Sequence, residues 1–294
     1  YMLTESDLRD SKPFADAVAI GGWPMDDHPP GGFDRSDIPP NTSIRTKEVF
    51  SIPLRSLYSR NVSNLMMAGR NISATHAAFT STRVMATCAV IGQAVGTAAA
   101  RCAAEKILPR ELAKDERRMT RLQQTLLRDD QTIRGLRNED PADLARRAKV
   151  IASAHEPSTP PSIVLDGWVR DIPGKEVHQW TARMGQAGAW IELQWEQPVT
   201  LREVQFTFDT GFQRELTLSS SDGTMKGIIR GPQPETVRDY RVLAAGKEIA
   251  QVKGNVQRLC RHKFEPVTTD RLRLQVDATN GSDLARVFEI RCYA

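Results

Sequence analysis

The sequence predicts an α+β protein in three parts: an α/β unit, a helical connector and an antiparallel β-sandwich. Residues 64–100 join a short apolar run to a long, uncharged helical segment, which is typical of an α/β unit. Residues 106–150 are highly charged and helical in pattern, and residues 151–294 alternate apolar with polar side chains at the period of a β-strand. We therefore expect domains at 1–105, 106–150 and 151–294.

Charge and length narrow the class of protein. The chain has 294 residues with 40 Lys and Arg against 36 Asp and Glu, a net charge of +4, which is too small and too interleaved to indicate a nucleic-acid partner. The longest uncharged stretch, Val84–Ala100, is short and only weakly apolar, so it predicts a buried helix rather than a membrane span. The first seven residues lack the features of a signal peptide and begin with Tyr1, so we expect part of a longer or processed chain.

The four cysteines indicate neither a disulfide scaffold nor a zinc site. Cys88, Cys102, Cys260 and Cys292 contain no C-x-x-C pair. A Cys260–Cys292 disulfide and two solitary thiols both remain open. No metal site is predicted, because the adjacent residues 26–28 lie on a loop rich in Pro and Gly and seldom converge on one ion.

The strand–helix unit carries the strongest chemical signal. Residues 64–69 predict a buried strand that ends at Gly69, where the backbone can approach a ligand closely. Arg83 precedes the helix predicted at 84–104, whose first turn offers free N–H groups and a partial positive charge. Such a helix start suits a flavin ring, whose pyrimidine edge gains negative charge on reduction. An α/β packing unit without a ligand is the alternative.

Small residues and leucines predict how the helices pack. Cys88, Gly92, Gly96 and Ala100 recur every four residues, so one face of the first helix should let a strand, a helix or a flat ligand approach the backbone closely. In the connector, the leucines at 122, 126 and 127 predict a core-facing stripe, and Asp140 followed by proline predicts another helix start.

The sandwich is predicted from period-two alternation. The apolar members are Ile191, Leu193, Trp195, Val204, Phe206, Phe208, Leu272, Leu274 and Val276. Short alternating strands separated by turns indicate antiparallel sheets with one buried face each.

Several motifs in the first part carry a family resemblance. Residues 50–57, 64–76, 83–88 and 92–100 resemble, in this order, the C-terminal FAD-binding segment of a bacterial family of FAD-dependent oxidoreductases, some of whose members carry a xanthan lyase label. Residues 19–30 resemble the substrate-side segment of the same family. The resemblance covers residues 14–105.

This resemblance implies site residues. The implied cofactor-binding residues are Gly69, Arg70, Arg83, Val84, Met85, Ala86 and Thr87. The implied catalytic residues are His28, His76 and Arg83, and Asp26 and His28 are implied to bind substrate. The alternative for each histidine is a hydrogen-bonded structural role.

One feature of that family is missing. Such enzymes hold the adenosine half of FAD on an N-terminal G-x-G-x-x-G turn, and the sequence contains none. The resemblance therefore implies half of an FAD site, completed by an N-terminal FAD-binding segment in cis or in trans. We expect residues 1–294 alone to bind FAD weakly or not at all.

The second half resembles a galactose-binding-like domain of the discoidin, or coagulation factor 5/8 C, type. The residues that carry the resemblance are Ile163–Gly167, Trp180–Ala182, Trp190–Trp195, Val199–Val204 and Asp270–Val276. It implies a jelly-roll sandwich that binds sugars through end loops, and it allows a structural calcium ion. Trp168, Trp180 and His178 are then candidates for an aromatic sugar platform, with core packing as the alternative for the tryptophans.

Two function hypotheses follow from the sequence. The first is the C-terminal portion of a flavoprotein that transfers hydride from a carbohydrate-like or polyol substrate to FAD. The second is a non-catalytic carbohydrate-binding or assembly protein. The sequence leaves a cytoplasmic or an exported location open.

Overall fold

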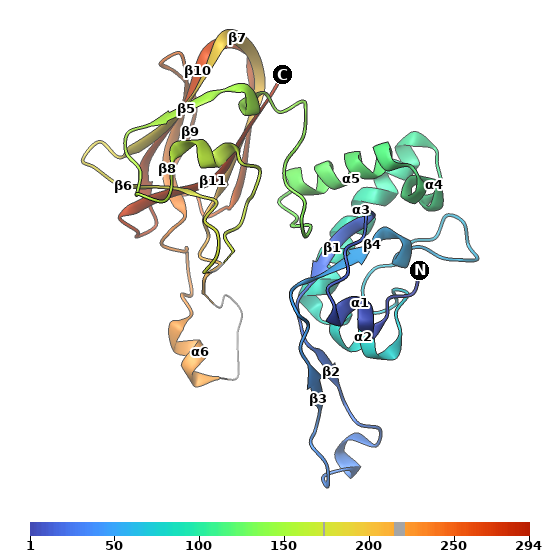
Figure 1. Ribbon diagram of the computed structural model, residues 1–294. Helices are drawn as coiled ribbons and strands as arrows, with labels where there is room; N and C mark the ends of the chain where they lie inside the picture. The colour runs from blue at the N-terminus through green and yellow to red at the C-terminus, as the bar shows by residue number, and fades with distance from the viewer. Residues whose placement is uncertain (173, 215–220) are drawn as a thin grey trace. The chain divides into compact units, whose positions relative to one another are not determined.

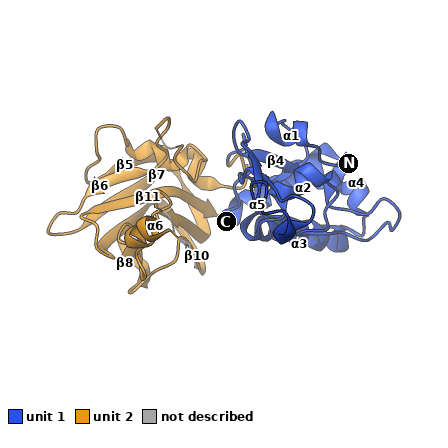
Figure 2. Cartoon of the chain, turned by 90° about the horizontal axis from the view of Figure 1, so that it is seen from below, with its two compact units in different colours: residues 1–137 blue, residues 138–294 orange. Residues whose placement is uncertain are grey.

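The computed structural model describes residues 1–172, 174–214 and 221–294, and it divides into two compact units (Figures 1 and 2). Unit 1 comprises Tyr1–Arg137 and unit 2 comprises Asn138–Ala294. No single helix among the described residues is long and apolar enough to cross a membrane; the pair α2 (His76–Thr82) and α3 (Met85–Glu105) meets that test only together and is bent by 91°.

Unit 1 is a set of helices around a small antiparallel sheet. The sheet pairs β1 (Ala17–Gly21) with β4 (Phe50–Pro53), and α3 (Met85–Glu105) and α5 (Glu116–Arg128) pack against β1. The remaining helices are α1 (Glu5–Arg9), α2 (His76–Thr82) and α4 (Pro109–Lys114). The predicted leucine stripe of α5 is confirmed, since Leu122, Leu126 and Leu127 are all buried.

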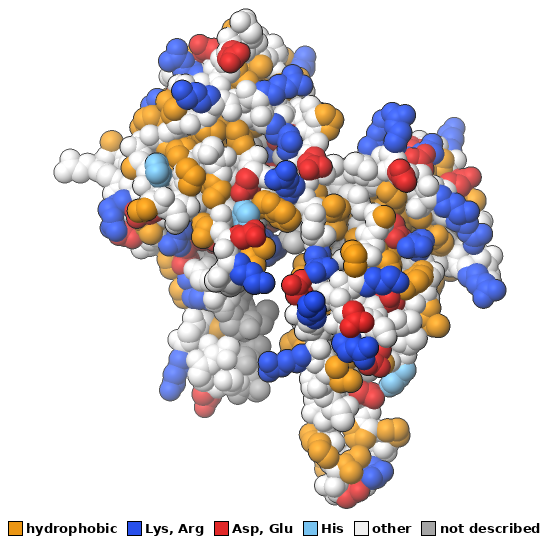
Figure 3. Space-filling model, viewed as in Figure 1, with side chains coloured by type: hydrophobic (Ala, Val, Ile, Leu, Met, Phe, Trp, Pro, Cys, Tyr) orange, Lys and Arg blue, Asp and Glu red, His pale blue; other side chains and the backbone are white. Residues whose placement is uncertain are grey.

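A separate hairpin extends from this core. It pairs β2 (Met25–Asp27) with β3 (Thr42–Ile44), and a 3₁₀ turn at Gly32–Asp34 lies in the loop between them. Apolar side chains gather at the end of this loop (Figure 3), and Phe33 there is fully exposed.

One local prediction for unit 1 is wrong, and another stays untested. Residues 64–69 form no strand: residues 64 and 65 are exposed, residues 66–69 are half-buried, and the one β-bridge of the segment joins Met66 to Tyr58 in a turn that returns to residues 57–59. The face of α3 that carries Gly92 and Gly96 is exposed, whereas Ile91 and Ala94 face the core, so the close approach of a flat ligand to the small-residue face stays a prediction. Apolar runs of this length do not distinguish a strand from a loop, and bulk rather than smallness decided which side of α3 is buried.

The helical segment is shorter than 106–150. The last helix, α5, ends at Arg128, and Asp140 starts no helix. Asp143 takes the capping role instead: its Oδ1 accepts a hydrogen bond from the Ala145 N–H at 3.0 Å and begins a 3₁₀ helix at Leu144–Arg147. This segment packs with unit 2.

Unit 2 is an antiparallel β-sandwich, as predicted. Its strands are β5 (Lys149–Ala152), β6 (Trp180–Arg183), β7 (Ala189–Phe208), β8 (Val237–Ala244), β9 (Lys247–Val252), β10 (Leu259–Thr279) and β11 (Leu284–Tyr293), with one short helix, α6 (Asp222–Gly227). The first half of β7 pairs with β5 and its second half with β11, while β10 accompanies both halves. The register of β10 shifts between Lys263 and Val267, where Pro266 lacks an N–H to donate. The long strands β7 and β10 therefore contribute to both layers of the sandwich.

The buried side chains confirm the alternation. All nine of the apolar positions predicted from it lie in the sandwich core. The four cysteines are free thiols, so no disulfide joins Cys260 to Cys292.

The indole of Trp195 ties the 3₁₀ segment to the sandwich. Its Nε1–H donates to the Leu144 carbonyl oxygen at 2.8 Å. Trp195→Phe keeps most of the apolar area and deletes this bond, so we expect the free energy of unfolding of unit 2 to fall by about 1 kcal/mol in denaturant titration. Trp190→Phe, at a half-buried ring below the Arg273 guanidinium, is the control and should cost less. Equal losses in both variants would contradict the assignment.

Candidate functional site

The candidate acid–base residues of unit 1 converge on strand β2. His76 Nε2 lies 2.9 Å from Asp27 Oδ1, although 49 residues separate them in the sequence. Arg83 Nη2 donates to the Asp26 carbonyl oxygen at 3.0 Å, and Ser81 Oγ donates to the Trp23 carbonyl oxygen at 2.6 Å. Helix α2 therefore presents its first residue and its C-cap to the same short strand.

His28 belongs to the same cluster. Its Nδ1 lies 3.1 Å from the Pro40 carbonyl oxygen, and its Nε2 lies 3.5 Å from Asp26 Oδ2. A carbonyl oxygen only accepts hydrogen bonds, so Nδ1 carries a proton. Asn41 Nδ2 donates to Asp26 Oδ1 and holds that carboxylate against the hairpin.

The cluster is open to solvent. The His76 side chain is 78% exposed, and those of His28 and Asp27 are about half exposed. Ion pairs this exposed contribute little to stability. Their arrangement thus leaves the imidazoles accessible to a substrate.

The residues implied to face the cofactor lie around the start of α3. Gly69 has φ +92°, a backbone conformation that favours glycine, and a Cβ there would meet nothing within 4 Å. The Arg70 guanidinium lies over the Phe79 ring at 5.6 Å. Arg83 caps α2 and Val84 caps α3, so the cofactor-side segment directly continues the acid–base cluster.

The first turn of α3 has unused hydrogen-bonding capacity. Val84 makes no side-chain cap bond, and helix geometry leaves the N–H groups of Met85, Ala86 and Thr87 without intrahelical acceptors. Met85 is 89% exposed and Ala86 is exposed, whereas the Thr87 side chain is buried. Only the backbone of Thr87 can therefore contribute to a ligand site.

The two tryptophan candidates of unit 2 differ in burial. Trp180 is fully buried and donates Nε1–H to the Ala154 carbonyl oxygen at 3.0 Å, which removes it from the expected sugar platform. Trp168 is half-buried and lies 5.6 Å from the His178 ring. The His178 imidazole is held between Asp166 Oδ2 at 2.7 Å and Glu176 Oε2 at 3.0 Å.

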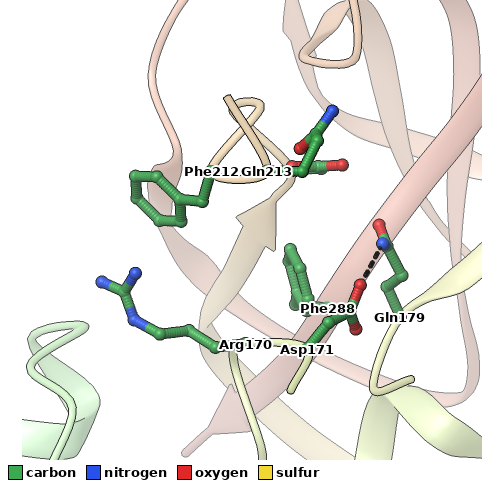
Figure 4. Close-up of a pocket in the computed structure, with 7 residues that line it drawn as sticks. Arg170, Asp171, Gln179, Phe212, Gln213 and Phe288 are labelled. Carbon is green, nitrogen blue, oxygen red and sulfur yellow. Dashed lines mark hydrogen bonds between the residues drawn. The ribbon is translucent and has the colours of Figure 1, made fainter. Parts of the chain in front are cut away.

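Unit 2 has a pocket of about 190 Å³, and one of its lining residues is Gln179, which follows His178 in the sequence (Figure 4). Its lining residues come from four separate segments: Arg170, Asp171, Gln179, Asp209, Phe212, Gln213 and Phe288. None of them was singled out from the sequence. The one local signal is the turn Asp209–Gln213 directly after β7, because polar and aromatic residues beyond a strand end often line sites.

Contacts between arginines and an aromatic ring, together with side-chain hydrogen bonds, position the residues that line this pocket. The Phe212 ring centroid lies 4.3 Å from the Arg170 guanidinium and 4.7 Å from that of Arg258. Gln179 Nε2 donates to Asp171 Oδ2 at 2.6 Å. Asp209 accepts a hydrogen bond from the Gly211 N–H at 2.9 Å, and its burial raises the pKa of this carboxyl above its ordinary value.

Metal binding has no geometric support in the part of the chain that the structure describes. No group of three or more His, Cys, Asp or Glu residues there is placed to hold an ion, and no calcium site is seen.

Comparison with known proteins supports the first resemblance. Residues 1–126 match the sequence profile described as FAD dependent oxidoreductase, and residues 143–227 match a domain of unknown function (DUF7402). The first 126 residues are thus similar to FAD-dependent oxidoreductases, a family whose description implies FAD as the cofactor. Among curated proteins, none matches the chain.

Solved structures similar to this chain cover about half of it. They include a chitosan-binding module from a Paenibacillus sp. IK-5 chitosanase/glucanase, at 13% identity, 52% of this chain, 98% of that one and a TM-score of 0.38. The family 32 carbohydrate-binding module of C. perfringens NanJ, in complex with galactose, is 11% identical over 51% of this chain and 96% of that one, with a TM-score of 0.37. The family 32 module of Streptococcus pneumoniae EndoD is 16% identical over 51% and 98%, with a TM-score of 0.37.

Proposed function

We propose that unit 1 supplies the substrate side and the flavin-facing helix start of an FAD-dependent oxidoreductase acting on a carbohydrate-like or polyol substrate. The observation that carries the proposal is the convergence of His28, His76 and Arg83 on β2, directly before the start of α3. These residues come from two separate sequence segments, the end of β2 and helix α2 with its C-cap, and neither core packing nor stability requires such exposed side chains to meet.

The residues at the start of α3 fit the implied cofactor. Exposed N–H groups and the partial positive charge of a 21-residue helix favour an electron-rich edge, and Gly69 leaves room for close approach. Gly69, Arg70 and Arg83, together with the backbone of residues 84–87, would hold FAD. When bound, FAD accepts a hydride from the substrate carbon at N5.

His76 acts as the proton acceptor in this proposal. Asp27 accepts a hydrogen bond from His76 Nε2–H, which leaves Nδ1 as the basic nitrogen. As a CH–OH group is oxidised to a carbonyl, Nδ1 of His76 would take the hydroxyl proton. His28 and Asp26 bind substrate hydroxyls, and Arg83 fixes β2 beneath them.

The test is flavin reduction in the absence of oxygen. The chain is produced with an N-terminal dinucleotide-binding segment, loaded with FAD and mixed with a panel of neutral sugars and polyols. We expect at least one of them to bleach the oxidised flavin bands. A loaded protein that no sugar or polyol reduces would contradict the proposed substrate class.

We also propose that unit 2 binds a glycan, with Trp168 at the rim of its site. The pocket of unit 2, which is lined by rings and polar groups, and the contact of the Trp168 ring with His178, next in sequence to the lining residue Gln179, support the proposal. Glycan-panel binding by the intact chain tests it. Glycan binding without any flavin uptake, even beside the dinucleotide-binding segment, would favour the second function, a non-catalytic carbohydrate-binding or assembly protein.

A further inference from the structure

Trp23 is an exposed indole next to the acid–base cluster of unit 1. The residue is 52% exposed, and its carbonyl oxygen accepts the hydrogen bond from Ser81 Oγ at 2.6 Å. Two residues after Ser81, Arg83 donates to the Asp26 carbonyl oxygen at 3.0 Å. Three residues of extended chain span at most ~11 Å, so the Cα atom of Trp23 lies no further than that from the Cα atom of Asp26. A ligand bound at β2 is therefore within reach of the indole.

The chain around Trp23 holds its backbone in place. At Gly21 a Cβ atom would lie 2.3 Å from the buried Phe50 ring, so this close contact requires glycine. Met25 is buried, and Pro24 restricts the backbone of Trp23 to extended conformations. Since the chain is fixed on both sides of Trp23, binding a ligand to the ring costs little ordering of the backbone.

Trp23 differs from the other four tryptophans of the chain. Trp180 and Trp195 donate their Nε1–H groups to backbone carbonyl oxygens. Trp168 lies beside a histidine ring, and Trp190 lies beneath a guanidinium group. Within residues 1–172, 174–214 and 221–294, Trp23 has no such ring contact and no acceptor for its Nε1–H. Both the face and the N–H group of this indole are therefore available to a ligand.

An indole face complements the C–H face of a sugar ring. The π-face carries partial negative charge, whereas the C–H groups of a pyranose carry partial positive charge and form a flat apolar surface. The hydroxyls at the edge of the sugar ring then remain free to reach the carboxylate of Asp26 and the imidazole of His28. An open-chain polyol has no rigid face of this kind, and it loses more conformational freedom when it stacks.

We infer that Trp23 is a stacking platform for the substrate at β2, and that it makes the site select a pyranose ring over an open-chain polyol. This inference rests on the proposed function of unit 1 and narrows its substrate class. A residue that binds the sugar ring and takes no part in proton transfer should change the substrate concentration that is required, and not the limiting rate.

The test compares methyl glucoside and methyl galactoside with their open-chain counterparts, sorbitol and galactitol. Nuclear magnetic resonance of the intact chain with isotope-labelled tryptophan reports on each indole N–H separately, and Trp23→Phe assigns the Trp23 resonance by its loss. We expect at least one of the two pyranosides to shift this resonance, and neither alditol to shift it at the same concentration.

Flavin reduction is the second readout, in the FAD-loaded protein produced with the N-terminal dinucleotide-binding segment. Trp23→Ala should raise the half-saturating pyranoside concentration about tenfold, because a stacking contact and its buried area are lost, and should leave the limiting rate unchanged. Trp23→Phe keeps a smaller ring and should lie between. Phe33→Ala removes the fully exposed ring in the hairpin loop; it is the matched control and should change neither quantity.

The possible failures are distinct. A shift confined to Trp168 of unit 2, an unchanged half-saturating concentration in Trp23→Ala, or alditols that bind as tightly as the pyranosides would each overturn the inference, while reduction of the flavin by a sugar or polyol leaves the proposed function in place. Reduction by none of them would overturn the proposed function together with the inference.

Discussion

Replacing His76 by asparagine should slow substrate-driven flavin reduction by roughly 10²–10⁴-fold, the usual loss when a positioned general base is removed. Asparagine keeps the polar character of an exposed side chain but cannot accept the substrate proton. Stopped-flow absorbance of the FAD-loaded protein measures the rate. Asp27→Asn should lower this rate less, because it only removes the 2.9 Å contact that fixes the tautomer of the His76 imidazole.

The control for this experiment is another exposed histidine. His155→Asn lies in unit 2, where its Nδ1 contacts the Glu156 carbonyl oxygen at 2.9 Å, and should leave the reduction rate unchanged. An unchanged rate in His76→Asn, with full flavin content, would remove His76 from the reaction.

Arg291→Ala should destabilise unit 2 by about 3–5 kcal/mol, because it leaves a buried carboxylate without its cation. Arg291 Nε donates to Glu289 Oε2 at 2.6 Å, and both side chains are almost fully buried. Arg241→Ala, which breaks the partly exposed pair with Asp277 on the same sheet, is the control and should cost at most about 1 kcal/mol. Equal midpoints for the two variants in denaturant titration would contradict this account.

The same pair predicts how stability depends on pH. Burial, only partly offset by Arg291, raises the pKa of Glu289 to about 7 from its ordinary value of 4.5. Asp143 shares this interior, and burial raises the pKa of its carboxyl too, although the N–H groups of Cys292 and Ala145 and the Asn138 amide stabilise its charged form. The folded state therefore binds the Glu289 proton more tightly than the unfolded state. The contribution is fully present below about pH 4.5 and is lost as the pH rises to about 7. Glu289→Gln should flatten this part of the stability profile.

The sandwich could be predicted because its signal is local and repeated. Alternation at Ile191, Leu193 and Trp195 reports one buried face directly, and each further strand repeats the same pattern. Residues 64–69 show no alternation of apolar and polar side chains, and an apolar composition alone does not specify a strand. Trp180 shows the limit of reasoning by residue type, since an indole suits a sugar platform and a core equally well until its burial is known.

The sequence predicted the residues of one candidate site but not those of the other. His28, His76 and Arg83 were named from a family resemblance, whereas their meeting at β2 depends on tertiary contacts that no periodicity encodes. The unit 2 pocket was missed because its residues are brought together from four segments.

The central claim is that the start of α3 faces the flavin, and one substitution tests it most directly. Ala86→Asp places a carboxylate on the exposed first turn, where a negative charge stabilises the helix itself but repels an electron-rich flavin edge. Ala99→Asp, at an exposed position further along α3, is the matched control. The measurement is bound FAD per chain, by absorbance, in protein produced with an N-terminal dinucleotide-binding segment. We predict at least a tenfold weaker retention of FAD in Ala86→Asp and parental retention in Ala99→Asp; equal FAD content in both variants would contradict the account.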